Sequence, residues 1–257
     1  MNMRGGSYEA DVRQTLENRK RLHANANLMY WYDRLYAQQF AGEPDFRNKR
    51  VLEIGSGSSP LKAIHPGILA SDVLALDYLD MVFDCHEIAD LAAIPDGSLD
   101  IITLTNVLHH LRDPLAFLRG ATRKLARGGR VYLAEPYFSL VSTPMYRLLH
   151  HEPVDFSIGR PVLARVDGPL SSANQAMPHM IFFSRPDWLA ELSASYDLAQ
   201  TRLSFFSGIS YPLSGGVSRR FPVPQSLYRT LFAADQVAAN VMPRIFASFF
   251  LARLVAR

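Results

Sequence analysis

The sequence predicts an α/β fold built on a doubly wound parallel sheet, and three observations support this prediction. Short apolar segments typical of strands recur between Val51 and Pro136. A segment with helical caps, residues 113–126, separates two of them. The first strand runs directly into a turn that contains Gly55 and Gly57. Strands and helices that alternate at this spacing are typical of parallel sheets covered by helices on both faces.

The individual elements follow from local patterns. After the strand that begins at residue 51, the predicted strands are 68–73, 79–84, 98–108, 130–136 and 197–206. The helix after the fourth strand has Asp113 as its N-cap and Pro114 in its first turn, and two glycines follow its end. A second helix is expected at 183–195. One or two helices, interrupted at Pro243, are expected over 225–257.

The chain divides into three segments. The first is an N-terminal helical lid segment, 1–50. The second is the main domain, 51–210, with an insertion on its substrate side at 137–180. The third is a C-terminal helical extension, 211–257. The lid is expected because Tyr32 and Tyr36, in an aromatic-rich stretch, follow helical spacing. We expect these aromatic side chains to serve both the mouth of a pocket and the core.

Length and composition place the chain among ordinary soluble globular proteins. Of its 257 residues, 48% are hydrophobic and 20% are charged, which excludes disordered and collagen-like chains. Cys85 is the single cysteine, so no internal disulfide forms, and no Cys/His cluster has zinc-site spacing. The N-terminus has no apolar signal segment, and no stretch has the length of a membrane span. We therefore expect a cytoplasmic protein without a metal site.

The segment Val51–Pro60, with the sequence VLEIGSGSSP, carries the strongest ligand-binding signal. A strand that ends near Glu53 and leads into Gly55 and Gly57 places backbone amides at its carboxyl end, where open α/β sheets bind ligands. Glycine lets a cofactor approach the backbone without a Cβ in the way. The dinucleotide fingerprint G-x-G-x-x-G requires a third glycine, and Pro60 stands in its place.

Polar residues end the next three strands. Asp72 ends the second strand, where a carboxylate accepts hydrogen bonds from ribose hydroxyls. Asp84 ends the third strand and Asn106 ends the fourth. If the second strand ends later, Asp77 takes the ribose-binding role, and Asp80 is a further rival.

Five segments, taken in order, resemble a known family. The chain is similar to class I S-adenosylmethionine-dependent methyltransferases, nearest the type-11 group, in VLEIGSGSSP, SDV, DCHEIADLAAIPDGSLDII, TNVLHHLRDP and LARGGRVYLAEP. The resemblance covers about residues 50–136. It implies a mostly parallel, seven-stranded sheet with the cofactor S-adenosylmethionine across the ends of the first, second and fourth strands. Ser58-Ser59-Pro60 replaces the third small glycine that is frequent in the family.

The resemblance also implies roles for individual residues. The two glycines would flank the methionine part of the cofactor, and Asp72 would hold the ribose. Asp84 and Cys85 would frame the adenine, and Asn106 would line the floor near the sulfonium. The full set of expected cofactor-binding residues is Glu53, Gly55, Ser56, Gly57, Asp72, Asp84, Cys85 and Asn106.

The sequence offers candidates for a general base, which an oxygen acceptor can require, and it leaves open whether one is used. Methyl transfer from a sulfonium is an in-line displacement in which the protein mainly holds the acceptor atom about 3 Å from the methyl group. No metal is required, and histidine is the usual base near neutral pH. The candidate catalytic residues are His110, after the fourth strand, His151, in the insertion, and Tyr137, after the fifth strand. A purely structural role stays open for each of them.

The acceptor is expected to be a small molecule that is methylated on an oxygen or a nitrogen atom. The tetrad N/D-P-P-Y/W of nucleic-acid methyltransferases is missing after the fourth strand, where TNVL stands, and no basic stripe lies near the pocket. Residues 211–222 loosely resemble methyltransferases of cell-surface polysaccharide genes, which favours a saccharide or lipid-linked saccharide. Two other functions stay open: a nucleotide-binding oxidoreductase, and a catalytically inactive protein that keeps the cofactor fold.

The last residues, PRIFASFFLARLVAR, are expected to form a basic amphipathic helix. Its apolar face would consist of Phe246, Phe249, Phe250 and Leu254, and its charge would come from Arg244, Arg253 and Arg257. Such a helix makes a peripheral contact with the inner membrane face, or packs on the domain or on a second subunit, which is the commoner outcome. The sequence leaves both readings and the oligomeric state open.

Overall fold

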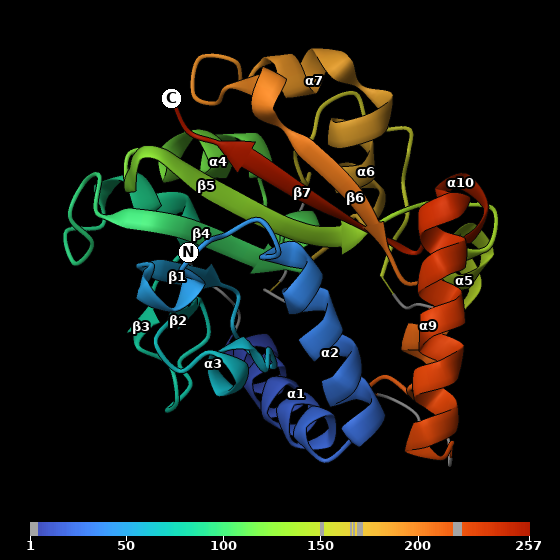
Figure 1. The fold of residues 1–257 in the computed structure, drawn as a ribbon. Coiled ribbons are helices and arrows are strands. Elements are labelled where there is room, and N and C mark those ends of the chain that lie inside the picture. Colours follow the sequence, from blue (N-terminus) through green and yellow to red (C-terminus); the bar gives the residue numbers. More distant parts are fainter. Residues whose placement is uncertain (1–4, 150–151, 165, 167, 169–171, 218–222) are drawn as a thin grey trace.

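The computed structural model describes residues 5–149, 152–164, 166, 168, 172–217 and 223–257. One seven-stranded sheet forms its centre (Figure 1). In order across the sheet, the strands are β3 (Met81–Val82), β2 (Leu69–Asp72), β1 (Val51–Ile54), β4 (Leu99–Thr105), β5 (Leu125–Pro136), β7 (Phe249–Val255) and β6 (Arg202–Phe206). Neighbours among β1 to β5 are parallel, and β7 is antiparallel to β5 and β6. The predicted doubly wound, mostly parallel sheet is confirmed.

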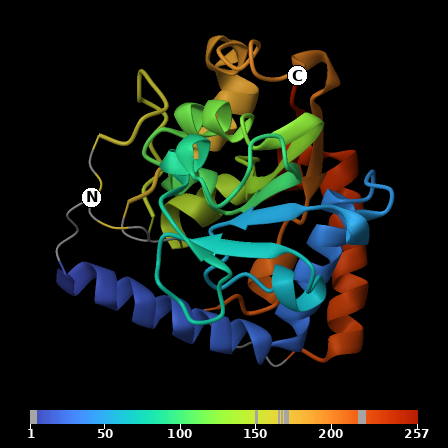
Figure 2. The ribbon, with the colours of Figure 1, turned by 90° about the vertical axis from the view of Figure 1, so that its left-hand side faces the viewer.

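Helices cover both faces of the sheet. They are α1 (Gly5–His23), α2 (Ala26–Gln39), α3 (Leu61–Ile64), α4 (Pro114–Ala121), α5 (Ser142–Leu149), α6 (Ala176–His179), α7 (Pro186–Ala190), α8 (Ser210–Leu213), α9 (Gln225–Val241) and α10 (Pro243–Phe246). The helices α4, α6 and α7 pack on one face, and α2 and the first half of α9 pack on the other (Figure 2). Parallel strands need this two-sided cover because their apolar residues point to both faces.

Two apolar clusters result, one on each face of the sheet. Val131 and Leu133 of β5 enter the cluster beneath α4, whereas Tyr132 between them enters the cluster beneath α2. Phe250 and Phe249 of β7 divide in the same way. This alternation is the two-residue period of a strand, and it anchors β5 and β7 on both sides.

The aromatic helix α2 belongs to the core. Asn25 caps it by accepting hydrogen bonds from the backbone N–H groups of Asn27 and Leu28. Trp31 is fully buried, and its Nε1 donates to Ser207 Oγ at 3.0 Å. Tyr32 of α2 also lines the pocket described below, as does Thr15 of the polar helix α1.

The C-terminal residues correct the sequence-based prediction. The predicted helices at 225–242 and the interruption at Pro243 are present as α9 and α10, but the basic amphipathic helix is wrong beyond Phe246. Residues 249–255 form β7 in the interior of the sheet. Periodicity does not separate a buried strand from a helix face in so short an apolar run. The peripheral membrane contact predicted through that helix therefore loses its basis. Within the described ranges, no helix has both the length and the apolar character to cross a membrane.

Several element ends also differ from the predicted ones. The helix predicted over 113–126 ends at Ala121, because Arg123 and Lys124 turn away to bond Asp96, each at 2.7 Å. The strand β5 begins already at Leu125, so the two glycines expected beyond the helix lie inside β5. The helix predicted over 183–195 contracts to α7.

Removing the side chain of Phe250 tests the placement of β7. Phe250→Ala should lower the free energy of unfolding by about 3–5 kcal/mol, because this fully buried ring packs against Phe182 and Phe183. The control Val241→Ala, at a position 71% exposed on α9, should change it by less than about 0.5 kcal/mol. Chemical denaturation measures both. Equal stability of the two variants would contradict a buried strand at 249–255.

Candidate active site

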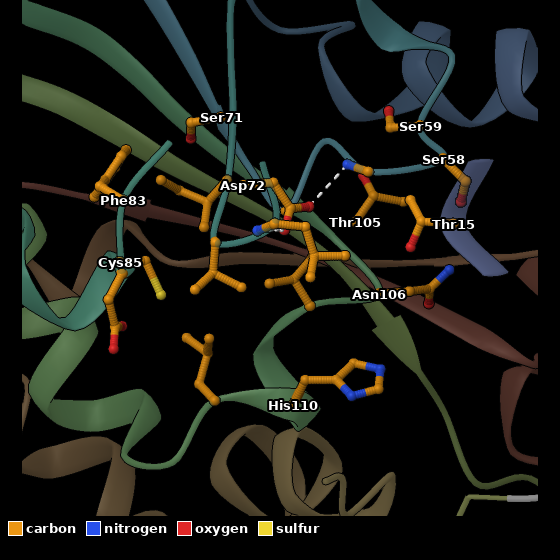
Figure 3. A pocket seen from close by; sticks show the side chains of 18 of the residues that line it. Thr15, Ser58, Ser59, Ser71, Asp72, Phe83, Cys85, Thr105, Asn106 and His110 are labelled. Carbon is orange, nitrogen blue, oxygen red and sulfur yellow. Dashed lines mark hydrogen bonds between the residues drawn. The ribbon is translucent and has the colours of Figure 1, made fainter. Parts of the chain in front are cut away.

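A pocket opens at the carboxyl ends of β1, β2 and β4, the edge at which open parallel sheets bind ligands (Figure 3). Six of the eight predicted cofactor-binding residues line it, namely Gly55, Gly57, Asp72, Asp84, Cys85 and Asn106. The other two, Glu53 and Ser56, are buried. They lie beneath the loop that follows β1, so they act on the shape of that loop.

The glycines of this loop are required by close contacts. Gly55 has a φ of 70°, in the left-handed region, and a Cβ there would lie 2.3 Å from Cγ2 of Val107. A Cβ on Gly57 would lie 3.1 Å from both Asp72 Oδ2 and Thr15 Cγ2. The loop after β1 therefore packs directly against the loop after β4 and against α1.

A buried carboxylate holds the loop from below. Glu53 accepts hydrogen bonds from Ser56 Oγ at 2.7 Å and from Ser59 Oγ at 2.5 Å. Burial raises the pKa of Glu53 to about 7, and the two serine hydrogen bonds oppose this rise only in part. Ser59 belongs to the Ser-Ser-Pro segment that departs from the family pattern, and Tyr36 also contacts its hydroxyl at 3.0 Å. That segment thus replaces a glycine with a hydroxyl that holds the buried acid.

Asp72 is the carboxylate in the pocket wall (Figure 3). It accepts hydrogen bonds from the backbone N–H groups of Gly57 at 2.9 Å and Leu74 at 3.0 Å. Burial raises its pKa, and these backbone bonds oppose the rise. Of its two rivals, Asp77 is exposed and Asp80 pairs with Lys62; neither lines the pocket. Since β2 ends at Asp72, the predicted end of the second strand is correct.

The helix α1 closes over the same loop. Arg19 donates from Nη1 to the Ser59 carbonyl at 3.0 Å and lies over the ring of Tyr78 at 3.9 Å. Tyr78 in turn donates its hydroxyl to the Gly57 carbonyl at 2.5 Å. Thr15 of α1 lines the pocket. Sequence reasoning missed these residues, because polar residues on a polar helix carry no signal of a ligand.

On the far side of the pocket, Asp84 is paired with a histidine. It accepts hydrogen bonds from the backbone N–H of His86 at 3.0 Å and from His86 Nδ1 at 2.8 Å. The side-chain bond from His86 lowers the pKa of Asp84, so this acid stays ionised. Cys85 beside it is buried, and burial raises the pKa of its thiol, which keeps it protonated. His86 also lines the pocket and was not predicted.

Asn106 turns the chain out of β4. Its φ of 56° lies in the left-handed region, which asparagine tolerates better than most residues. Its backbone N–H donates to the Ala134 carbonyl at 2.8 Å. The side chain lies at the pocket, between the glycine loop and His110 (Figure 3).

His110 is the predicted catalytic residue that the structure brings to the pocket. Its Nδ1 lies 3.0 Å from the Ser172 carbonyl oxygen, and its Nε2 lies 3.6 Å from Glu152 Oε1. Burial, aided by the neighbouring His109, lowers the pKa of His110 to about 4. The ring is therefore neutral at pH 7. Because Nδ1 faces a carbonyl oxygen, the proton belongs on Nδ1 and the lone pair on Nε2.

The other two predicted catalytic residues are not brought to this pocket. Tyr137 packs its ring against His179, Phe183 and Phe205 and is not among the lining residues. His151 lies outside the described residues.

The pocket fits an adenosyl sulfonium cofactor. Its glycine loop leaves no room for a Cβ beside Asp72, and this carboxylate stands at the end of β2, where ribose hydroxyls find an acceptor. A second acidic residue, Asp84, stands across the pocket after the third strand. Together with a seven-stranded sheet whose β7 runs antiparallel, these features define the class I S-adenosylmethionine-dependent methyltransferases.

Comparison with known proteins agrees with this class. The family model described as "Methyltransferase domain" matches residues 25–200. Ubiquinone biosynthesis O-methyltransferase of Xanthomonas oryzae pv. oryzae (strain PXO99A) is 26% identical over 186 residues, which are 65% of this chain and 68% of that protein. The enzyme of the same name from Neisseria meningitidis serogroup C is 26% identical over 110 residues, 36% of this chain and 46% of that protein.

A solved structure shares the fold. The SAM-dependent methyltransferase from Archaeoglobus fulgidus superposes with a TM-score of 0.50 at 15% identity, over 88% of this chain and 94% of that one. The family model covers well over half of the chain, so the chain belongs to the methyltransferase-domain family and is a transferase whose cofactor is S-adenosylmethionine. The oxidoreductase alternative falls away.

Replacing Glu53 should change how stability depends on pH. Its folded-state pKa of about 7 lies above the ordinary 4.5, so its stabilising contribution is present below the lower value and is lost as the pH rises through 7. Glu53→Gln mimics the protonated acid at all pH values. The free energy of unfolding of this variant, relative to that of wild type, should therefore rise by up to about 3 kcal/mol as the pH increases from about 5 to about 8.

Denaturant unfolding across this pH range measures the difference, with Glu87→Gln, at an exposed position, as the control. A gap between Glu53→Gln and wild type that stays constant with pH would contradict the buried, perturbed carboxyl group.

Proposed function

We propose that this methyltransferase transfers a methyl group to a hydroxyl oxygen of a small molecule, with His110 as the general base. The single observation that carries the proposal is the position of His110. It lines the same pocket as the glycine loop, and its Nδ1 is held by a backbone carbonyl. A histidine oriented in this way presents a lone pair, and not a proton, at Nε2.

In this proposal the cofactor lies along the carboxyl ends of β1, β2 and β4. Gly55 and Gly57 receive its methionine part, Asp72 its ribose, and Asp84 with Cys85 its adenine. When bound, S-adenosylmethionine supplies an electrophilic methyl group, and the electrons of the S–C bond stay on sulfur as the new O–C bond forms. The protein aligns the acceptor oxygen and removes its proton.

The proton passes from the acceptor hydroxyl to Nε2 of His110. The neutral state of His110 at pH 7 makes it available for this step. Glu152 Oε1, 3.6 Å from Nε2, is placed to stabilise the imidazolium that forms. General base catalysis of this kind contributes about 10²–10⁴-fold to a rate.

The relatives support an oxygen acceptor, since the two curated enzymes are named O-methyltransferases. The finer proposal of a saccharide or lipid-linked saccharide rested on residues 211–222. Tyr211 packs against Trp31 and Phe249, and none of 211–217 lines the pocket, while 218–222 lie outside the described residues. These residues therefore no longer support a saccharide acceptor, and we propose only that the acceptor is a small molecule with a hydroxyl group.

Calorimetric titration with S-adenosylmethionine tests the placement of the cofactor. Asp72→Ala should weaken binding by about 1–3 kcal/mol, because the ribose hydroxyls lose their acceptor. Asp77→Ala, five residues further along and exposed, is the matched control and should bind as wild type does. A larger loss of affinity for S-adenosylmethionine in Asp77→Ala than in Asp72→Ala would overturn this placement of the cofactor.

Methyl transfer to hydroxyl-bearing small molecules, followed by release of S-adenosylhomocysteine, tests the base. His110→Gln should lower kcat by about 10²–10⁴-fold, because the proton of the hydroxyl loses its acceptor. The affinity for S-adenosylmethionine should stay the same. Unchanged turnover in His110→Gln would contradict the proposed base. A wild-type protein that binds the cofactor but methylates no hydroxyl would favour the alternative of a catalytically inactive protein that keeps the cofactor fold.

A further inference from the structure

Behind His110 lies an ionic cluster that the proposed function has not yet used. It joins Glu135 of β5, the turn Leu108–His110 after β4, and Glu152 of the segment that follows α5. Glu135 is completely buried, and His109 is 2% exposed. Burying an ionisable side chain costs free energy unless it is hydrogen-bonded or paired with an opposite charge.

His109 bridges two carboxylates. Its Nδ1 lies 2.6 Å from Glu135 Oε2, and its Nε2 lies 3.2 Å from Glu152 Oε2. A carboxylate oxygen only accepts, so both ring nitrogens carry protons and the ring is a cation. Burial alone would disfavour this cation, but Glu135 and Glu152 outweigh it and raise the pKa of His109 to about 10.

Each carboxylate is tied to its place. Glu135 also accepts hydrogen bonds from the backbone N–H groups of Val107 at 2.9 Å and Leu108 at 2.6 Å. Glu152 also accepts from Gln175 Nε2 at 2.9 Å, again through Oε2. Two donors thus converge on Oε2 of Glu152, and its other oxygen, Oε1, faces Nε2 of His110.

We propose that His109 is a positioning residue: as a buried imidazolium it holds Glu152 with Oε1 directed at Nε2 of His110, and it keeps His110 uncharged before the reaction. This inference rests on the proposed role of His110 as the base. The two imidazole rings lie 4.3 Å apart between centroids, so the charge on one acts strongly on the other.

The charges of the cluster suit proton uptake. One imidazolium and two carboxylates leave one net negative charge beside a neutral His110. When the O–H bond of the acceptor breaks, its proton moves to Nε2 of His110, and the cluster becomes neutral overall. The negative charge of Glu152, whose Oε1 lies 3.6 Å from Nε2, then stabilises the new imidazolium. Burial is the largest influence on the pKa of His110, and the charged groups among the described residues that act on it are His109, Glu152 and Glu135, so the cluster tunes the basicity of His110.

The pH profile of kcat separates positioning from a merely structural role. In wild type, no acid limb from His110 should appear between about pH 5.5 and pH 8, because the pKa of His110, about 4, lies below this range. In His109→Gln the neighbouring cation is lost, so the pKa of His110 rises and an acid limb should enter the range. The plateau should fall about tenfold or more as Glu152 loses its orientation.

Glu152→Gln is the matched variant with the opposite electrostatic effect. Removing its negative charge makes His110 less basic, so the plateau should fall without an acid limb in the same range. The control His179→Gln changes a partly buried histidine outside the cluster and should leave the shape of the profile unchanged. Loss of stability in His109→Gln with a flat pH profile would overturn the inference.

A spectrum of the wild-type protein tests the cluster without turnover. Nitrogen-15 NMR of labelled histidine should show one histidine protonated on both nitrogens up to about pH 9, and a neighbour protonated on Nδ1 alone. If both His109 and His110 are neutral at pH 7, the inference is contradicted. It is also contradicted if a chelator abolishes turnover and a divalent cation restores it, because a metal ion bound by His109 would need its Nε2 unprotonated. If the spectrum is as expected while no hydroxyl is methylated, the proposed function fails and the cluster stands.

Discussion

Buried carboxylates hold the two loops that form the pocket. A carboxylate removed from water must be hydrogen-bonded, so its donors are drawn into one geometry. Glu53 gathers two serine hydroxyls beneath the loop after β1, and Glu135 gathers two backbone amides beneath the loop after β4. The close approach of Gly55 to Val107 then joins the two loops. A change in either acid is therefore transmitted to the pocket, although neither acid lines it.

The two sides of the pocket use ionised groups in different ways. On the cofactor side, Asp72 and Asp84 accept hydrogen bonds from nearby N–H groups and face the pocket as acceptors. On the opposite side, His109 lies between two carboxylates, and burial together with this neighbour lowers the pKa of His110. The first arrangement suits binding of hydroxyls and amines, whereas the second suits uptake of a proton. Both follow from which partner each buried group has, and not from burial alone.

Much of the fold and half of the site could be predicted from the sequence, because those parts are local. Gly55, Gly57, Asp72 and Asp84 lie at strand ends that short apolar runs reveal, and parallel strands bring their carboxyl ends to one edge. The strand β7 was misread, since FFLARLV satisfies helical and strand periods alike. Contacts between distant segments had no sequence signal at all: Arg19 on Ser59, and Glu152 on His109.

The difference between local and long-range contacts also separates the cofactor side of the pocket from the surroundings of His110. The cofactor side is assembled within residues 53–106, from backbone turns that tolerate few side chains. His110 in the pocket wall contacts the Ser172 carbonyl and Glu152, and both of these groups come from the segment between β5 and α6. That segment can change in sequence and length without disturbing a parallel strand, because it connects elements at the surface of the sheet. In the function proposed above, the base therefore stays with the fold, whereas the groups that contact it come from the segment between β5 and α6.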